Sequence, residues 1–298
     1  MEESTLRGHH GSGGGDDGTG QPSQGRMPDR RGALWNRGSR IGSAVTTMMP
    51  GREGFLPFLS FFIVAIAWEA LVIAQVWDPA VLPGPRQVAA STLELLRSGS
   101  LFEHSVASLF RVTAGYYLAI LVGIPLGVLF GTWTAGRRVF NSFIQFLRPI
   151  SPLAWIPLAM LWFGIGEKPA VFLIFLSAVF PILVPVMDAV NQINTTYFRV
   201  ASNFGLNRRE VVLDVILPAI LPRVLPALRI SLGVAWMVVV AAEMIAVKSG
   251  LGFLILDSRN ALRMDYVISA MLTIGVIGVV LDRIMLRWMR LPSVSWAR

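Results

Sequence analysis

The sequence predicts an all-α polytopic membrane protein with about six helices that cross a lipid bilayer. Of its 298 residues, 54% are hydrophobic and only 15% are charged, and the mean hydropathy is +0.60. These values lie outside the usual range of soluble domains. Several apolar runs reach the roughly 20 residues that a helix needs to cross a ~30 Å hydrocarbon layer. The absence of cysteine excludes disulfides and thiolate chemistry.

Residues 1–54 are predicted to be a largely disordered cytoplasmic tail, because they are rich in Gly, Ser and Asp and have no apolar period. His9 and His10 lie in this tail without other His or Cys nearby, so no metal site is expected. The first apolar run begins too late and continues too long for a secretory signal. The net charge of +8 is attributed to topology and lipid contact, and no nucleic-acid binding is expected.

The transmembrane domain is predicted over residues 55–290, with a short cytoplasmic tail at 291–298. A short amphipathic helix is expected at 88–104, between the first two spans. Glycines recur at every fourth position in the second span, at Gly123, Gly127 and Gly131, which predicts a smooth face for close helix packing. The six spans are expected at residues 55–76, 109–132, 140–163, 170–190, 225–247 and 266–286.

The third span is unusual because it carries Pro149, Pro152 and Pro157. Three prolines would break a straight helix, and the freed carbonyl groups need protein or water partners. Irregular backbone at membrane depth is tolerated where it lines a cavity. The third span is therefore predicted to be broken and to line a cavity.

Residues 191–222 form a basic island between two apolar runs. Asn194 is placed to cap a helix that ends before Gly205, and Asn207 with Glu210 resembles a second capping arrangement. The stretch therefore predicts a helix, a glycine turn and a second helix. Prolines 218, 222 and 226 are expected to bend the chain back into the bilayer. From these residues alone, an amphipathic linker resting on lipid headgroups remains an equal alternative.

The distribution of positive charge predicts the topology. Six spans place both termini on one side. Counted from residue 30, the segments of that side carry fourteen Lys and Arg residues, Arg223 among them, against six in the opposite loops. By the positive-inside rule, both termini and the 191–222 loop are cytoplasmic.

The 191–222 loop resembles the "EAA" loop of ABC-importer permeases. Ala201 and Gly205 match that pattern, Val215 stands for its Ile, and Leu217-Pro218 closes it, whereas Arg199 stands in place of the Glu. The stretches 148–167 and 233–255 resemble the permeases for nitrate, taurine, aliphatic sulfonates and bicarbonate. The resemblance covers roughly residues 55–290.

This resemblance implies a type I ABC importer (MetI-like) permease fold in a bacterial inner membrane. It implies as partners a second copy of the chain, two cytoplasmic ATPase subunits and an external substrate-binding protein. The chain has no G-x-x-x-x-G-K-[ST] motif, so ATP and Mg are expected on the partner ATPase, with no cofactor and no enzymatic activity in this chain. The expected coupling residues are Arg199, Ala201, Gly205, Arg208, Arg209, Glu210, Leu217 and Pro218.

The expected pathway would carry a small oxyanion or sulfonate past neutral or partly positive groups. Trp155 is either a gate or a packing residue, and Glu243 is expected to be structural or gating. Arg148 is expected to meet an anion, to snorkel or to pair with Asp188, and the pair is favoured. The pathway candidates are Arg148, Ser151, Pro152, Trp155, Pro157, Trp236 and Glu243.

The alternative function is a self-powered secondary transporter or channel for a small anion. That class predicts internal repeats and transport without an ATPase, and no convincing repeat is present. An intramembrane enzyme is disfavoured because the chain has neither H-E-x-x-H nor G-x-S-x-G.

Overall fold

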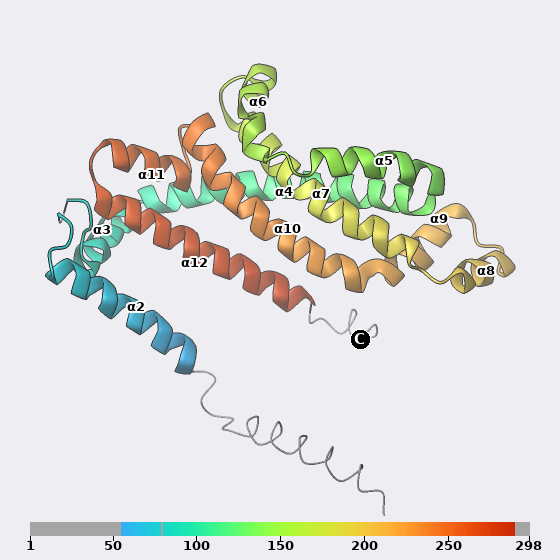
Figure 1. The fold of residues 1–298 in the computed structure, drawn as a ribbon, viewed down its shortest axis with the longest axis horizontal. Helices are drawn as coiled ribbons and strands as arrows, with labels where there is room; N and C mark the ends of the chain where they lie inside the picture. The colour runs from blue at the N-terminus through green and yellow to red at the C-terminus, as the bar shows by residue number, and fades with distance from the viewer. Residues whose placement is uncertain (1–54, 79, 290–298) are drawn as a thin grey trace, which may run out of the picture. The chain divides into compact units, whose positions relative to one another are not determined.

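The computed structural model describes residues 55–78 and 80–289. The predicted tails at 1–54, including His9 and His10, and at 291–298 lie outside the described residues. The chain divides into two units at Phe61, so the first residues of helix α2 (Phe55–Ile73) belong to the first unit and the described residues from Phe62 onward belong to the second. Every regular element among the described residues is helical (Figure 1), so the predicted all-α class is confirmed.

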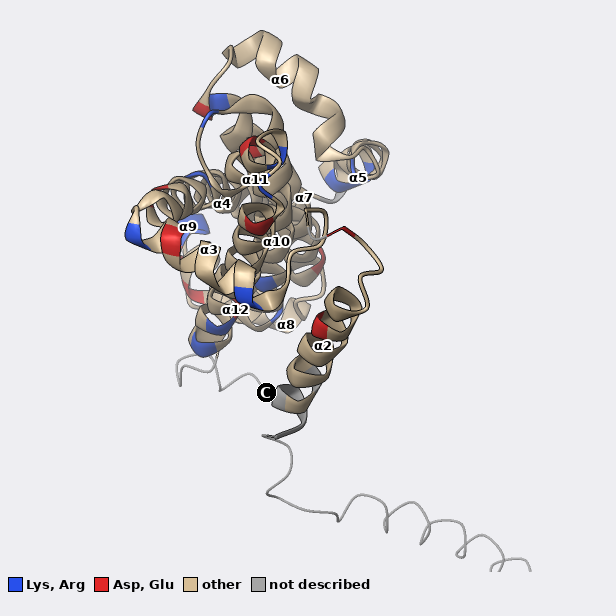
Figure 2. Cartoon of the chain, turned by 90° about the vertical axis from the view of Figure 1, so that its left-hand side faces the viewer, with Lys and Arg blue, Asp and Glu red and all other residues tan. Residues whose placement is uncertain are grey.

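Four helices are long and apolar enough to cross a membrane, and a sharply bent pair supplies a fifth candidate span. Figure 2 shows these helices mostly in tan, the colour of uncharged residues. The first predicted span coincides with the shorter apolar helix α2 (Phe55–Ile73). The four long helices are α4 (Ser100–Thr132), α7 (Glu167–Asn191), the continuous helix Arg208–Ala246 and α12 (Met264–Met289).

Short helices connect the spans. The predicted amphipathic helix is α3 (Pro85–Arg97), which ends earlier than expected because Gly99 adopts a positive φ of 77° and α4 begins directly after it. The remaining short elements are η1 (Pro152–Trp155), α6 (Ile156–Phe163), α8 (Thr195–Asn203), α9 (Arg208–Glu210), the π-helical turn η2 (Val211–Ile216) and α11 (Leu251–Asn260).

Helices α4 and α7 pack closely along the predicted glycine face. A Cβ atom added at Gly127 would lie 2.6 Å from Val186 Cγ1, and one at Gly131 would lie 2.6 Å from Val190 Cβ. Such distances leave room only for glycine, as expected for small residues at a membrane helix interface. Gly115 and Gly123 face Ile174 and Ile182 of α7 in the same way. Each glycine of α4 therefore lies opposite the α7 residue that follows it by the same number of positions in the sequence. The two helices therefore run in the same direction, and the segment between them leads the chain from the end of α4 back to the level at which α4 begins.

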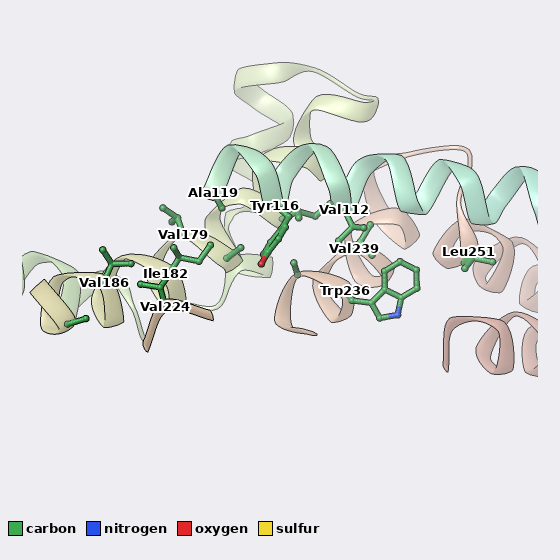
Figure 3. Close-up of a cluster of buried hydrophobic side chains, with 14 of the residues drawn as sticks. Val112, Tyr116, Ala119, Val179, Ile182, Val186, Val224, Trp236, Val239 and Leu251 are labelled. Carbon is green, nitrogen blue, oxygen red and sulfur yellow. The ribbon is translucent and has the colours of Figure 1, made fainter. Parts of the chain in front are cut away.

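The third helix of the core, α10 (Leu217–Ala246), runs antiparallel to α4. The Tyr116 hydroxyl of α4 donates a hydrogen bond of 2.8 Å to the carbonyl oxygen of Leu228. Figure 3 shows the apolar side chains that α4, α7 and α10 contribute to the core, among them Val112, Ile182 and Val239. These three helices form the frame on which the loops are positioned.

The returning segment is broken, as the three prolines predict. α5 (Thr134–Leu147) and the η1–α6 pair meet at an angle of 86°. The hydroxyl of Ser151 accepts a hydrogen bond from the backbone N–H of Leu153 and caps η1. Figure 1 shows the sharp bend between α5 and α6, and Ile156 and Ala159 of α6 pack against Ala170 and Leu173 of α7.

The prediction that prolines 218, 222 and 226 bend the chain is wrong. Residues Arg208–Ala246 form one continuous helix, in which α9, η2 and α10 follow each other without a turn. The wider π turn of η2 directly precedes Pro218, so the missing N–H of this proline falls where the hydrogen-bond pattern of the helix changes. The fifth span therefore begins inside the segment that was assigned to the loop.

Candidate functional site

The loop between α7 and α10 has the predicted helix–turn–helix form. The Asn194 side chain accepts a hydrogen bond of 2.9 Å from the N–H of Thr196 and caps α8. Gly205 has φ +71° and ends that helix. Asn207 accepts from the N–H of Glu210, and the Glu210 carboxylate accepts from the N–H of Asn207 at 2.7 Å, which is a complete capping box.

Helix α8 presents an exposed apolar face. Tyr197, Val200 and Phe204 are 61%, 47% and 81% exposed, and their spacing places them on one side of the helix. Ala201 of the same helix is buried. Large exposed apolar side chains with this spacing are typical of a helix that docks into a groove. Tyr197 and Phe204 were not among the predicted coupling residues.

The other predicted coupling residues are exposed or half-buried. Arg199, Arg208 and Arg209 are exposed, and Glu210 is half-buried. Leu217 and Pro218 are half-buried at the start of α10. α9 continues without a break into α10, so the second part of the loop belongs to a helix of 39 residues.

Three of the predicted pathway residues line one cavity. Arg148, Pro152 and Trp155 border a space of about 250 Å³ at the bend of the broken span, together with Ser177 of α7 and Val234 of α10. The cavity therefore lies beside the middle of both long helices. Trp155 is half-buried there, so its indole is positioned to narrow the space.

Two further cavities follow the seam between α7 and α10 toward the α8 end. The second, of about 360 Å³, is bordered by Arg148, Pro181 and Arg223. The third, of about 460 Å³, is bordered by Arg223, Gln192 and residues of the loop. We call the three cavities together the α7–α10 groove.

The favoured pair between Arg148 and Asp188 is not formed. Both side chains are exposed, and no ion pair between them is present in the described residues. Arg148 faces the groove at the end of α5, whereas Asp188 lies near the end of α7. Ser151 and Pro157 are exposed beside the bend but do not border the first cavity.

Glu243 and Trp236 lie in the core and not along the groove. Glu243 and Arg111 are both fully buried, and the Glu243 carboxylate accepts a hydrogen bond of 2.6 Å from Arg111 Nη1. Trp236 is 6% exposed, and its indole N–H donates to the carbonyl oxygen of Ile274 on α12. The expectation that Glu243 has a structural role fits this position, while Trp236 is a packing residue between α10 and α12.

Arg111 is the centre of a network that the sequence analysis did not anticipate. Its guanidinium donates to Glu243, to Glu167 at the start of α7, and to the carbonyl oxygen and hydroxyl of Ser249. Ser108 donates to the Glu243 carboxylate at 2.8 Å. The network joins α4, α7 and α10 at the end opposite to α8. An arginine within an apolar run is itself a signal of function or pairing, and it could have been found by that rule.

Within residues 55–78 and 80–289, no group of three or more His, Asp or Glu residues is arranged to hold a metal ion. The described site thus consists of the exposed apolar face of α8, the groove beside α7 and α10, and the buried Arg111 network at the opposite end.

Comparisons with known proteins place this arrangement in a family. Residues 119–291 match the family model of the binding-protein-dependent transport system inner membrane component. The taurine transport system permease of Escherichia coli is 34% identical, over 78% of this chain and 86% of that protein. The bicarbonate transport system permease of Synechococcus elongatus is 36% identical, over 72% of this chain and 82% of that protein. The nitrate import permease of the same organism is 32% identical, over 79% of this chain and 88% of that protein.

A solved structure of the MetNI methionine ABC transporter, in an inward-facing conformation, is similar over 60% of this chain and 91% of that chain, at 19% identity and a TM-score of 0.49. The family match also decides against the self-powered transporter or channel. Permease subunits of this kind are not themselves enzymes. The chain is a multi-pass membrane protein and belongs to the inner membrane components of binding-protein-dependent transport systems, the permease subunits of ABC importers.

Proposed function

We propose that this permease imports a small oxyanion or sulfonate across a bacterial inner membrane. The observation that carries the proposal is the similarity to permeases whose names specify taurine, bicarbonate and nitrate. Nitrate and bicarbonate are oxyanions and taurine carries a sulfonate, so a planar or tetrahedral group of anionic oxygens is common to all three.

Two copies of the chain form the pathway in this proposal, each contributing its α7–α10 groove. Closed two-fold assemblies are the commonest arrangement of soluble homo-oligomers, and a pathway between two identical chains follows the same symmetry. The groove is open on a single copy, since Arg148 and Arg223 are exposed.

In this proposal, α8 is the contact through which an ATPase subunit acts on the permease. An ATPase subunit with a bound ATP and Mg receives the exposed face of Tyr197, Val200 and Phe204, with Arg199, Arg208 and Arg209 at its margin. Closure of two ATPase subunits then moves α8, and the continuous helix Arg208–Ala246 transmits that movement into the bilayer. In this orientation α8 and both termini are cytoplasmic.

The substrate reaches the permease from an external binding protein. The experiment that tests the proposal is co-expression of this chain with an ATPase subunit and a binding protein from the same genome, followed by purification. Recovery of a complex and binding of nitrate, taurine or bicarbonate to the isolated binding protein are expected. A binding protein that takes up a cationic or uncharged ligand, and none of these three, contradicts the proposal.

A further inference from the structure

Two arginines that border the groove have no carboxylate partner. Arg111 and Arg229 are each neutralised by a carboxylate from a neighbouring helix. No such ion pair involves Arg148 or Arg223 within residues 55–78 and 80–289. Arg148 lies at the bend of the broken span, where a positive charge without a partner is costly and marks a functional position. An unneutralised arginine in a transport groove has the charge that a passing anion needs.

Both arginines stand where two cavities meet. Arg148 borders the first and the second cavity of the groove, and Arg223 borders the second and the third. The Arg223 guanidinium donates to the side-chain oxygen of Gln192, a neutral group that leaves its charge uncompensated. An anion that moved along the groove would pass one guanidinium and then the other.

The cavities are ordered along the helices. On α7 they begin at Ser177, near the middle of the helix, and reach Gln192, just past its end. That stretch rises about 22 Å at 1.5 Å per residue, which is a large part of the ~30 Å hydrocarbon thickness. The groove therefore leads from the middle of the bundle to the α8 end.

We propose that Arg148 and Arg223 are successive binding stations for the transported anion, a small oxyanion or sulfonate. This inference rests on the proposed function. A guanidinium presents a planar fork of N–H donors that binds two oxygens of one oxyanion. Because both side chains are exposed, each station binds weakly enough to release its ligand, as conduction between successive sites requires.

A carboxylate beyond the second station favours release. Asp214 borders the third cavity together with Arg223. An anion that leaves Arg223 toward the α8 end meets this negative charge, which opposes its return.

The test uses the full complex of permease, ATPase and binding protein in proteoliposomes, with nitrate, taurine and bicarbonate as probes. Arg148→Gln and Arg223→Gln are each expected to lower the ATP-driven uptake rate about tenfold, the loss of one charge-assisted contact. Arg148→Lys and Arg223→Lys keep the charge and are expected to retain roughly half of the rate. Arg138→Gln is the matched control, because it removes an exposed charge from α5 away from the groove cavities, and uptake at the wild-type rate is expected.

A second measurement needs no variant. In the wild-type complex, the transported anion is expected to slow the modification of Arg148 and Arg223 by phenylglyoxal, while Arg138 reacts at an unchanged rate. Equal protection of all three residues, or none, contradicts the two stations.

The outcomes separate the two proposals. If the wild-type complex carries one of the probes and the glutamine variants match it, the anion stations are wrong and the proposed function stands. If Arg138→Gln lowers uptake as much as the glutamine variants of the groove, the loss of uptake is not specific to the groove, and the stations are again wrong. If the wild-type complex carries none of the three probes, the proposed function fails and the stations fail with it.

Discussion

Arg111 and Glu243 form a buried ion pair between α4 and α10, with Nη1 2.6 Å from Oε1 and the side chains 1% and 0% exposed. The two residues are far apart in sequence, and their contact closes the end of the bundle opposite to α8. Ser108 and the N–H of Gly252 donate further hydrogen bonds to the same carboxylate. The position of the start of α11 thus depends on a carboxylate of α10.

Removal of one partner from this pair is expected to destabilise the protein strongly. Glu243→Ala leaves the Arg111 charge buried with less compensation and is expected to lower the unfolding free energy by about 3 kcal/mol. The double variant Arg111→Met/Glu243→Met removes both charges and is expected to lose less than the sum of the single variants. Unfolding in mixed micelles measures both effects, and additive losses would show that the two residues are not coupled.

The glycine face of α4 gives a second prediction. Gly127→Ala places a methyl group 2.6 Å from Val186 Cγ1 and 3.0 Å from the carbonyl oxygen of Leu183. Helices α4 and α7 must then separate, at a cost of about 1–3 kcal/mol. Gly275→Ala in α12 is the matched control, because a Cβ there has no atom within 4 Å. It is expected to be neutral or stabilising by up to about 1 kcal/mol, and equal losses in both variants would contradict the close packing of α4 on α7.

The turn after α8 gives a third prediction. Gly205→Asp is expected to abolish transport and ATPase coupling while membrane insertion stays intact. Any side chain at φ +71° strains the backbone, but aspartate adopts a positive φ more readily than most residues, and no atom lies within 4 Å of the added Cβ. The added carboxylate changes the surface beside α8. Co-purification with the ATPase subunit is the measurement.

Gly99→Asp is the control for that variant, since Gly99 also has a positive φ and open space but lies at the turn before α4. It is expected to co-purify with the ATPase at the wild-type level. Recovery of the ATPase with Gly205→Asp at that same level would refute the docking role of α8.

Features set by neighbouring residues were predictable from the sequence. The capped helix after Asn194, the turn at Gly205 and the capping box at Asn207 depend on side chains that lie within a few residues of each other. The break at the prolines of the third span and the glycine face of α4 have equally local signals.

Features set by distant residues were not predictable. The Arg111 network needs Glu167, Glu243 and Ser249, which only the packing of α4, α7 and α10 brings together. The pair between Arg148 and Asp188 was proposed from charge alone, and the end of α5 directs Arg148 to the groove instead. Arg223 was counted only as a topology signal, because nothing near it in sequence indicates that two cavities meet there.

ATP-dependent uptake by the reconstituted complex tests the central claim most directly. Proteoliposomes that contain the permease, its ATPase and its binding protein are supplied with nitrate, taurine or bicarbonate, and internal anion is measured with ATP or a non-hydrolysable analogue. Uptake of one of these anions is expected only with ATP and only when the binding protein is present. Uptake by the permease alone, driven by an ion gradient without the ATPase, would contradict an importer that takes its energy through α8.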